Sequence, residues 1–555
     1  MSSYDHTQYQ PFAFAPQKLY PSFTRTWPNR EITRAPIWAS VDLRDGNQSL
    51  IDPMTIEQKL TFFDTLLKCG FKEIEVGFPA AAQVEFDFMR RLIDENLIPD
   101  DVTVQVLVQA REHLIARTFE SLEGCKQAVV HVYNSTSRVQ RTKVFARSKD
   151  EIKQIAVEGA QLVKDYAARY PQTQWTYQYS PESFTQTEPD YAVEVCEAVC
   201  RVWQPETGQK VILNLPATVE ATTPNVFADQ VEYFCQNLAS RKDVIISLHT
   251  HNDRGCAVAA AELGVMAGAD RIEGTLFGNG ERTGNMDIVT MALNLYSQGV
   301  DPELDFSRMG EIAQVVKACN NLPIHPRHPY VGELVFTAFS GSHQDAIKKS
   351  LEYDEREGSD HWDVAYLPID PRDISRSYQD VVRINSQSGK GGVAYILKRD
   401  FGFDLPRWLQ VDFSQVVQRE AEDQARELSS DEILELFNRA FLSDSRIQIN
   451  DYSAGKQGAQ HTFSGEISLD DQTHAISGES NGPLSAFLAG IKSALGIDAQ
   501  VVNFSEHALG QGSDAVAAAY LQLSVKGEVY SGIGTDTSTT YAMLKACTRA
   551  LAKAI

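Results

Sequence analysis

Two histidines near the middle of the chain have the spacing of a metal-chelating pair. They follow the apolar run Val244–Leu248, within the segment Ser247–Asp253. Side chains alternate faces along a strand, so His249 and His251 would project to the same side. Neutral imidazoles suit a divalent cation, and carbonyl chemistry would add an oxygen ligand and open positions for substrate. An exposed edge strand that carries two histidines by chance explains the spacing equally well.

Two other segments also end in side chains of the metal-ligand type. The pattern of Ile37–Gln48 predicts a buried strand that ends in charge, with Arg44 and Asp45 at its tip. The pattern of Asp270–Phe277 predicts another strand, and the glycine-rich segment Gly278–Asn285 follows it. An Arg beside an acid is often only a surface ion pair of little energetic value. Three strand ends that all carry such residues favour one shared site.

The composition limits the number of domains and the class of partner. With 555 residues, of which 43% are hydrophobic, the chain is long enough for more than one domain. A formal net charge of −23 argues against nucleic acid as a partner, because phosphate binding needs clustered Lys and Arg. No run approaches the ~18 apolar residues of a membrane span. We therefore expect no membrane partner. Because the eight cysteines are scattered, we expect a reduced, cytoplasmic chain.

From residue 37 onward, short apolar runs alternate with amphipathic segments. Eight runs occur within about 260 residues, at 37–43, 73–78, 102–108, 128–133, 175–180, 211–215, 244–250 and 270–277. The segments between them carry apolar residues at helical spacing. This number and size predict a (β/α)8 TIM barrel, an α/β fold whose active site lies at the carboxyl ends of the strands. A doubly wound open sheet alternates similarly, but its ligand site would lie at one switch point.

Three sequence motifs carry a resemblance to a known enzyme family. Leu43–Gln48, Leu248–Ala257 and Gly278–Asn285 resemble the α-isopropylmalate synthase and homocitrate synthase family, which condenses acetyl-CoA with a 2-oxo acid. Phe336–Lys349 and Tyr366–Arg372 look like the linker of the branch that converts 3-methyl-2-oxobutanoate to 2-isopropylmalate. The resemblance therefore implies an acyltransferase at the first committed step of leucine biosynthesis, inhibited by leucine.

The chemistry of this reaction suggests a role for each polar residue at the strand ends. A divalent metal would bind the 2-oxo acid and polarise its ketone; the expected ligands for Mg2+, Mn2+ or Zn2+ are Asp45, His249, His251 and Asn285. Arg44 suits the developing negative charge, and Glu182 suits proton transfer, although a solvated loop glutamate is the alternative. Glu281 joins the catalytic set because the glycine-rich segment can bring it close to a small ligand.

The resemblance also implies the residues of the oxo-acid pocket. They are Leu107, His131, Tyr133, Ser180, Asn214, Pro216 and Thr218. An apolar Leu107 fits a branched hydrocarbon tail, whereas His131 by itself would also be explained as a core histidine with satisfied hydrogen bonds. By the same resemblance, His343 and Tyr378 reach into the barrel of a partner subunit, with His343 near the thioester as a candidate base. An active homodimer is therefore expected.

The composition changes after residue 300. The prolines of Asn321–Tyr330 exclude a helix and mark a boundary, and the next segment looks like a helix start with Ser342 as its cap. We divide the chain into an N-terminal arm (1–36), a catalytic barrel (37–320), linker subdomains (321–430) and a regulatory domain (431–555). Residues 385–392 lack the full phosphate-loop pattern, but a loop that binds a CoA phosphate stays open.

The last 110 residues or so contain a weak internal repeat of strands followed by a helix. Two such units would form one layered domain, and helix openings at Gly482 and Asp536 could hold the carboxylate of an amino acid. Ordinary turns in a dimerisation domain are the alternative. By resemblance this is a leucine-sensing domain, with the effector near Gly482, Leu484, Ala508, Asp514 and Gly534.

Other functions stay open on the sequence alone. A citramalate synthase would keep the barrel chemistry, use pyruvate and share such a tail. A non-catalytic leucine-binding protein is the alternative from another class, but it would have no reason to keep the complete set of candidate metal ligands. The resemblance also leaves open activation by a monovalent cation.

Overall fold

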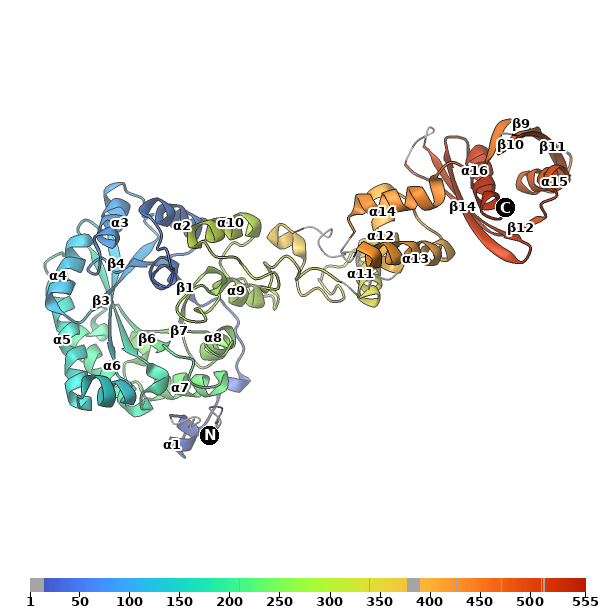
Figure 1. Cartoon of the computed structure of the whole chain (residues 1–555). Coiled ribbons are helices and arrows are strands. Elements are labelled where there is room, and N and C mark those ends of the chain that lie inside the picture. Colours follow the sequence, from blue (N-terminus) through green and yellow to red (C-terminus); the bar gives the residue numbers. More distant parts are fainter. Residues whose placement is uncertain are drawn as a thin grey trace, which may run out of the picture. The chain divides into compact units, whose positions relative to one another are not determined.

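The computed structural model describes residues 14–208, 210–338, 340–376, 390–424, 428–470, 472–510, 512 and 515–555. The chain divides into two compact units, one formed by residues 1–335 with 373–375 and the other by residues 336–372 with 376–555 (Figure 1).

The first unit is built around a closed barrel of eight parallel strands in sequence order (Figure 1). Its strands are β1 (Ile37–Ser40), β2 (Glu73–Gly77), β3 (Thr103–Gln109), β4 (Gln127–Ser135), β5 (Gln174–Glu182), β6 (Val211–Ala217), β7 (Ile245–Thr250) and β8 (Arg271–Gly274). Pairing of β8 with β1 closes the ring. The predicted TIM barrel is confirmed.

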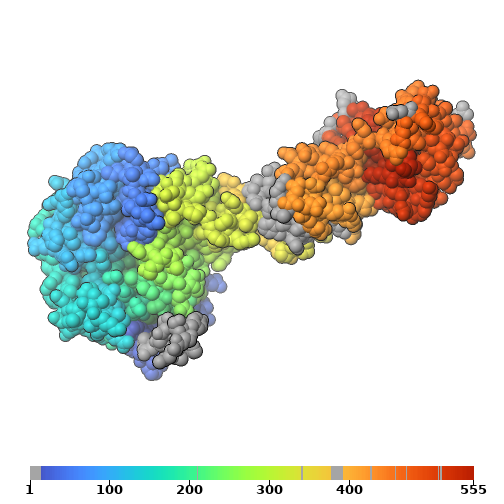
Figure 2. All heavy atoms as spheres, in the orientation of Figure 1, coloured from blue at the N-terminus to red at the C-terminus, as the bar shows by residue number. Residues whose placement is uncertain are grey.

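Helices follow the strands and cover the barrel. They are α2 (Ile56–Lys68), α3 (Gln83–Asp94), α4 (Glu112–Ser121), α5 (Lys149–Ala167), α6 (Pro189–Trp203), α7 (Pro224–Asn237), α8 (Ala257–Met266), α9 (Ile288–Tyr296) and α10 (Met309–Asn320). Thr55 and Ser148 begin α2 and α5 with capping boxes, which satisfy the free N–H groups of the first turn. In the space-filling view, the blue to teal surface of the first unit belongs largely to these outer helices (Figure 2).

Two of the predicted strands are too long. The run 37–43 stops at Ser40, because Asp42–Gly46 forms a π-helical turn in which Asp42 turns to accept the backbone N–H of Leu276 at 3.0 Å. The run 270–277 stops at Gly274, because Leu276–Gly278 forms a 3-10 turn with Phe277 at a φ of 59°. Both corrections lie at the carboxyl ends of strands, where the chain bends to present polar groups.

The described part of the N-terminal arm lies across the barrel unit. It contains the short helix α1 (Pro16–Leu19) and contacts α7, where Arg25 forms two hydrogen bonds to Asp229 at 2.7 and 2.6 Å. The indole of Trp27 donates to the same carboxylate at 2.9 Å, and Tyr20 stacks on Tyr233. These residues of the arm therefore pack on the barrel unit.

The second unit starts with helices and ends in two sheets. Its helices are α11 (Gly341–Glu357), α12 (Lys390–Phe401), α13 (Arg407–Gln424) and α14 (Ser430–Phe437). The predicted cap of α11 is wrong by two residues, because Ser340 occupies the N-cap position and Ser342 lies inside the first turn. No helix of the described residues is long and apolar enough to cross a membrane.

The predicted repeat in the tail is confirmed as two units of three strands and a helix. The first consists of β9 (Ile447–Gln457), β10 (Gln460–Leu469), β11 (Gln472–Ser480) and α15 (Pro483–Leu495). The second consists of β12 (Ala499–Ala508), β13 (Ala517–Val525), β14 (Glu528–Asp536) and α16 (Thr539–Ala552). Each sheet is antiparallel, and apolar residues of both sheets and both helices form one core.

Candidate active site

A cavity of about 320 Å3 lies at the carboxyl ends of the barrel strands. Its lining comes from loops and strand ends around the ring: Arg44, Asp45, Gln48, Phe78, Leu107, His131, Tyr133, Ser180, Glu182, Asn214, Pro216, Thr218, His249, His251, Glu281 and Arg282. The structure thus brings together most of the barrel residues that the sequence nominated for the site. Gln48 and Arg282 are additions.

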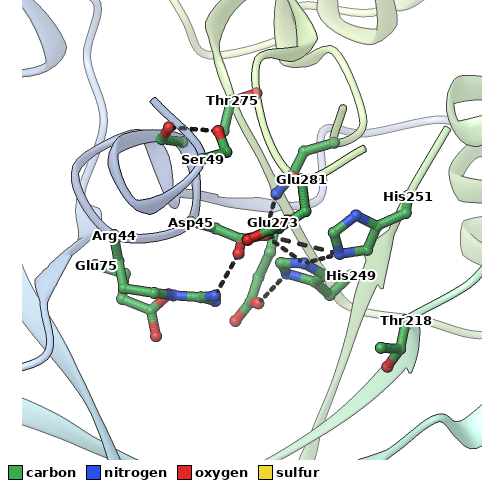
Figure 3. A network of polar contacts seen from close by, with 12 residues as sticks. Arg44, Asp45, Ser49, Glu75, Thr218, His249, His251, Glu273, Thr275 and Glu281 are labelled. Atoms are coloured by element: carbon green, nitrogen blue, oxygen red, sulfur yellow. Dashed lines mark hydrogen bonds and ion pairs between the residues drawn. The ribbon is translucent and has the colours of Figure 1, made fainter. Parts of the chain in front are cut away.

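Three of these residues form a cluster that could hold a metal ion (Figure 3). The Nε2 atoms of His249 and His251 lie 3.1 Å apart, and the Asp45 Oδ2 atom lies 3.2 Å from the first and 3.7 Å from the second. All three side chains are buried, and their ligand atoms lie within 4.8 Å of one another. Two imidazole nitrogens and a carboxylate oxygen that converge in this way fit a divalent cation.

The local fold explains how the cluster forms. His249 lies on β7 and His251 directly after it, so both rings face the barrel interior two residues apart. Asp45 belongs to the π-helical turn after β1, which pairs with β8 beside β7. Strands more than 200 residues apart in sequence therefore supply one site. Burial alone would raise the pKa of Asp45, but Arg44 at 2.7 Å and the two histidines hold it well below its usual range.

Asn285 lies beside the cluster. It forms an isolated bridge with His251, and its Nδ2 atom donates to Asp45 Oδ2 at 2.7 Å. Its Oδ1 atom is buried and has no hydrogen-bond partner among the described residues. A Cβ at Gly280 would lie 2.0 Å from that oxygen, so only glycine leaves room for the amide. An unpaired buried oxygen at this point is consistent with a further metal ligand.

The two histidines differ in their protonation. Burial by itself would lower the pKa of His249, but its hydrogen bonds to Asp45 and Glu273 raise it to about 9. Burial and the neighbouring His249 lower the pKa of His251 to about 3. Because a metal ligand must be deprotonated, binding of a cation to His249 releases a proton near neutral pH.

The fully buried carboxylate of Glu273 orients the His249 ring through its Nδ1 atom. Glu273 Oε2 lies 2.9 Å from His249 Nδ1, and its Oε1 atom accepts from Arg271 Nη1 and Gln178 Nε2, each at 2.7 Å. The hydrogen bond places a proton on Nδ1 and leaves Nε2 to face Asp45, which is the arrangement that a metal-ligating histidine needs. Burial opposes ionisation of Glu273, but His249 and Arg271 hold its pKa well below the usual range.

A second buried carboxylate serves the other side of the site. Glu75 accepts from Arg44 Nε at 2.5 Å and lies 2.8 Å from His131 Nδ1. The other ring nitrogen of His131 is 2.7 Å from Ser180 Oγ, which also accepts from Asn214 Nδ2 at 3.0 Å. Burial opposes ionisation of Glu75 as well, but Arg44 and His131 lower its pKa. Arg44 is thus held in a fixed position at the cavity wall.

Sequence reasoning missed Glu75 and Glu273. The available signal was the alternation in Glu73–Gly77 and Arg271–Gly274, where an acid occupies an inward-facing strand position between apolar residues. An acid that faces the interior of a barrel needs a buried cation or ligand beside it. Arg271, which is fully buried and also bonds Glu73 at 2.6 Å, was missed for the same reason.

The remaining cavity wall combines apolar and polar groups. Leu107 is 8% exposed and Pro216 lines the same cavity, so an alkyl group has apolar neighbours there. Thr218 Oγ1 accepts the backbone N–H of Ser183 at 2.9 Å, next to Glu182. Burial raises the pKa of Glu182, which makes this carboxyl a stronger proton acceptor than an exposed one.

Comparison with known proteins gives the family. Three family models match: HMGL-like over residues 35–316, alpha-isopropylmalate synthase post-catalytic domain-like over residues 333–398, and LeuA allosteric (dimerisation) domain over residues 421–555. The 2-isopropylmalate synthase of Parafrankia sp. is 53% identical over 99% of this chain and 97% of its own length. That of Pseudomonas savastanoi pv. phaseolicola is 52% identical over 97% of this chain and 98% of its own. The chain belongs to the 2-isopropylmalate synthase family.

One solved structure that is similar to part of this chain is the HMG-CoA lyase of Bacillus subtilis. It is 20% identical, covers 52% of this chain and 95% of its own, and has a TM-score of 0.43. Assignment to the 2-isopropylmalate synthase family rests on the full-length relatives instead.

Two residues expected to complete the 2-isopropylmalate synthase site belong to the second unit. His343 lies in the first turn of α11, where its ring stacks on that of Tyr366 with centroids 3.9 Å apart. Tyr378 lies outside the described residues, as does the segment 385–389 of the suggested phosphate loop. The roles of His343 and Tyr378 stay predictions.

The candidate leucine-site residues of this family member have different surroundings. Gly482 is the N-cap of α15, with space around it, and Leu484 packs against the core of the domain. Ala508 is the exposed last residue of β12. A Cβ at Gly534 would lie 2.0 Å from the Ala542 carbonyl oxygen, so this glycine permits close packing of β14 and α16. Asp514 lies outside the described residues.

Proposed function

We propose that the chain condenses acetyl-CoA with 3-methyl-2-oxobutanoate and hydrolyses the thioester, giving 2-isopropylmalate and CoA. The observation that carries this proposal is the buried cluster of Asp45, His249 and His251 at the wall of a cavity that also contains Arg44 and Leu107. A divalent cation held by the cluster would bind the carboxylate of the 2-oxo acid, and Leu107 would contact its branched hydrocarbon tail. Family membership assigns the chain to leucine biosynthesis.

Four residues would hold the divalent cation, whether Mg2+, Mn2+ or Zn2+. They are Asp45, His249 and His251, with Asn285 as a further ligand through its unpaired Oδ1 atom. When bound, the cation supplies Lewis-acid polarisation of the ketone. Glu273 keeps the Nε2 atom of His249 available for this role. Activation by a monovalent cation stays a prediction.

The chain's own groups would move the proton and stabilise charge. Glu182 takes a proton from the acetyl methyl group or orients the base that does so, helped by its raised pKa. The methyl carbon then forms the new C–C bond to the ketone carbon, and the negative charge on the former ketone oxygen lies near Arg44. The guanidinium is already fixed by Glu75 and Asp45, so it needs little reorganisation. Water finally cleaves the thioester and releases the thiol.

The second unit suggests assembly and regulation. We infer a homodimer in which His343 and Tyr378 of one subunit complete the barrel site of the other, with leucine as the effector of the last domain. Support comes from the match of residues 421–555 to an allosteric (dimerisation) domain. The candidate leucine contacts are Gly482, Leu484, Ala508, Asp514 and Gly534. The division at residues 36, 320 and 430 and the cytoplasmic location remain part of the proposal.

Release of free thiol from acetyl-CoA tests the proposed function. The acceptors are 3-methyl-2-oxobutanoate, pyruvate and 2-oxoglutarate, each with a divalent metal and with or without leucine. The proposal predicts the highest rate with the branched acid and a loss of rate on adding leucine. Preference for pyruvate would instead assign citramalate synthesis, and no thiol release from any acid would favour a leucine-binding protein without activity.

A further inference from the structure

We propose that the loop between β4 and α5, residues 136–148, binds the nucleotide end of acetyl-CoA. In this proposal Lys143 and Arg147 contact the phosphates, and Phe145 packs against the adenine. This role of the loop rests on the proposed function, because it takes acetyl-CoA as the substrate. It goes further by assigning a binding place to the phosphates of acetyl-CoA.

The cavity itself cannot hold the phosphates. Its lining includes no Lys and only two Arg side chains, Arg44 and Arg282, both already paired with acids, and the proposed divalent cation is engaged by the oxo acid. Arg44 contacts Asp45 at 2.7 Å, and Arg282 contacts Asp253 at 2.6 Å. A group with several negative charges would therefore face the acids of the cavity without free cations, so the nucleotide must extend out of the cavity along its rim.

Among the loops at the carboxyl ends of the strands, the β4–α5 loop differs in charge. It carries Arg138, Arg141, Lys143 and Arg147 and no acid. Each of the other seven loops has at most one Arg and no Lys. In a chain with a formal net charge of −23, four cations within ten residues are a local exception. Clustered Lys and Arg are the side chains that bind phosphate groups.

The base of this loop is fixed beside the active-site cavity. The backbone N–H of Thr136 donates to the carbonyl oxygen of Glu182 at 3.1 Å, and Glu182 lines the cavity. Arg141 is buried and binds Glu188 through Nη2 at 2.8 Å, while the backbone N–H of Arg147 donates to the Arg141 carbonyl at 2.9 Å. The loop therefore starts at the cavity rim and has a defined shape.

The tip of the loop offers both charge and apolar surface. Within the π-helical turn Gln140–Phe145, Val144 is 66% exposed and Phe145 is 46% exposed. Lys143 forms no ion pair with any described residue, and Arg147 has only a longer-range attraction to Glu151. An exposed aromatic ring beside uncommitted cations suits a base attached to phosphates. Arg138 is less available, because its guanidinium lies over the ring of Phe14.

Two thioesters of different length test the proposal. Acetyl-CoA carries the nucleotide, whereas S-acetylpantetheine has the same reacting group and lacks the phosphates and adenine. In full-length protein, the double substitution Lys143→Ala with Arg147→Ala should lower kcat/KM for acetyl-CoA about tenfold, since each exposed ion pair contributes up to about fivefold. With S-acetylpantetheine the same variant should match the wild type. Phe145→Ala should show the same difference between the thioesters.

Lys242→Ala is the matched control. This substitution removes one exposed positive charge at the amino end of β7, away from the loop, and should leave kcat/KM for both thioesters unchanged. An unchanged kcat/KM for acetyl-CoA in the double variant would overturn the proposal. An equal loss with both thioesters would also overturn it. So would a double variant that sediments differently from the wild type, because the loop would then lie at a contact between two copies of the chain. If the wild type releases no thiol from any oxo acid, the proposed function fails, and calorimetric binding of CoA to the same variants still decides the role of the loop.

Discussion

The substitution Glu273→Gln removes the charge that orients His249 while keeping the size of the side chain. Glu273 is 1% exposed and faces donors from His249, Arg271 and Gln178 at 2.7–2.9 Å. A carboxylate accepts from all of them, whereas an amide has one acceptor oxygen and two donor hydrogens. At least one donor therefore loses its partner in the variant.

Both orientations of the new amide weaken the metal site. If its NH2 group faces His249, the ring proton moves to Nε2, the atom that faces Asp45. If its oxygen faces His249, the NH2 group meets the donors of Arg271 and Gln178. Loss of such a partner lowers metal affinity about 10- to 100-fold, which corresponds to about 1.4–3 kcal/mol. The stability loss should stay below the ~3–5 kcal/mol of an orphaned buried charge, because Arg271 keeps Glu73 at 2.6 Å.

Titration of metal-free protein with Mn2+ or Zn2+ against a chelating dye measures this affinity, and thermal unfolding measures the stability. Gln178→Met is the control, because it removes a donor to Glu273 and leaves the contact with His249 intact. It should cost stability without a comparable loss of metal affinity. A folded Glu273→Gln protein whose metal affinity stays within twofold of the wild type would refute the role assigned to Glu273.

Three further changes separate metal binding, proton transfer and regulation. Asp45→Ala should abolish turnover and metal retention with an intact fold, and unchanged metal content in the purified protein would contradict the ligand assignment. Glu182→Gln should lower kcat about 100-fold or more. Burial raises the pKa of Glu182, so on acidification the wild type loses the basic form of this carboxyl at a higher pH than an exposed glutamate would. The variant should lack the corresponding fall of kcat/KM at acidic pH. Truncation near residue 430 should remove inhibition by leucine, and a truncated enzyme that leucine still inhibits would exclude the tail as the sensor.

The barrel was predictable because its strands are buried on both faces. Runs such as Val211–Leu215 are almost wholly apolar, and the helices between them carry regular capping signals such as Thr55 and Ser148. The ends of strands were less predictable. Asp42 stops β1 early because it bonds the backbone of Leu276, more than 200 residues further along the chain. A local pattern contains no information about such a partner.

The candidate site was predictable in its metal ligands and less so in what supports them. His249 and His251 lie two residues apart at the end of β7, so their spacing is visible in the sequence. Pairing of β7 with β8 brings Glu273 beside His249, and Arg271 lies two residues before Glu273 on the same strand. The contacts of Glu75 with Arg44 and His131 and of Glu273 with His249 join residues far apart in the sequence, so a local pattern does not show them. The same holds for Arg141, whose partner Glu188 lies on the next loop.

In the proposed reaction, a metal ion at Asp45, His249 and His251 supports condensation of acetyl-CoA with a branched 2-oxo acid. The most direct test starts from metal-stripped protein with acetyl-CoA and 3-methyl-2-oxobutanoate, adds metal back in steps, and quantifies free thiol and 2-isopropylmalate together. We expect almost no product without metal and one 2-isopropylmalate for each thiol once metal is restored. Full product formation in the stripped protein, or thiol release without 2-isopropylmalate, would contradict the proposed reaction.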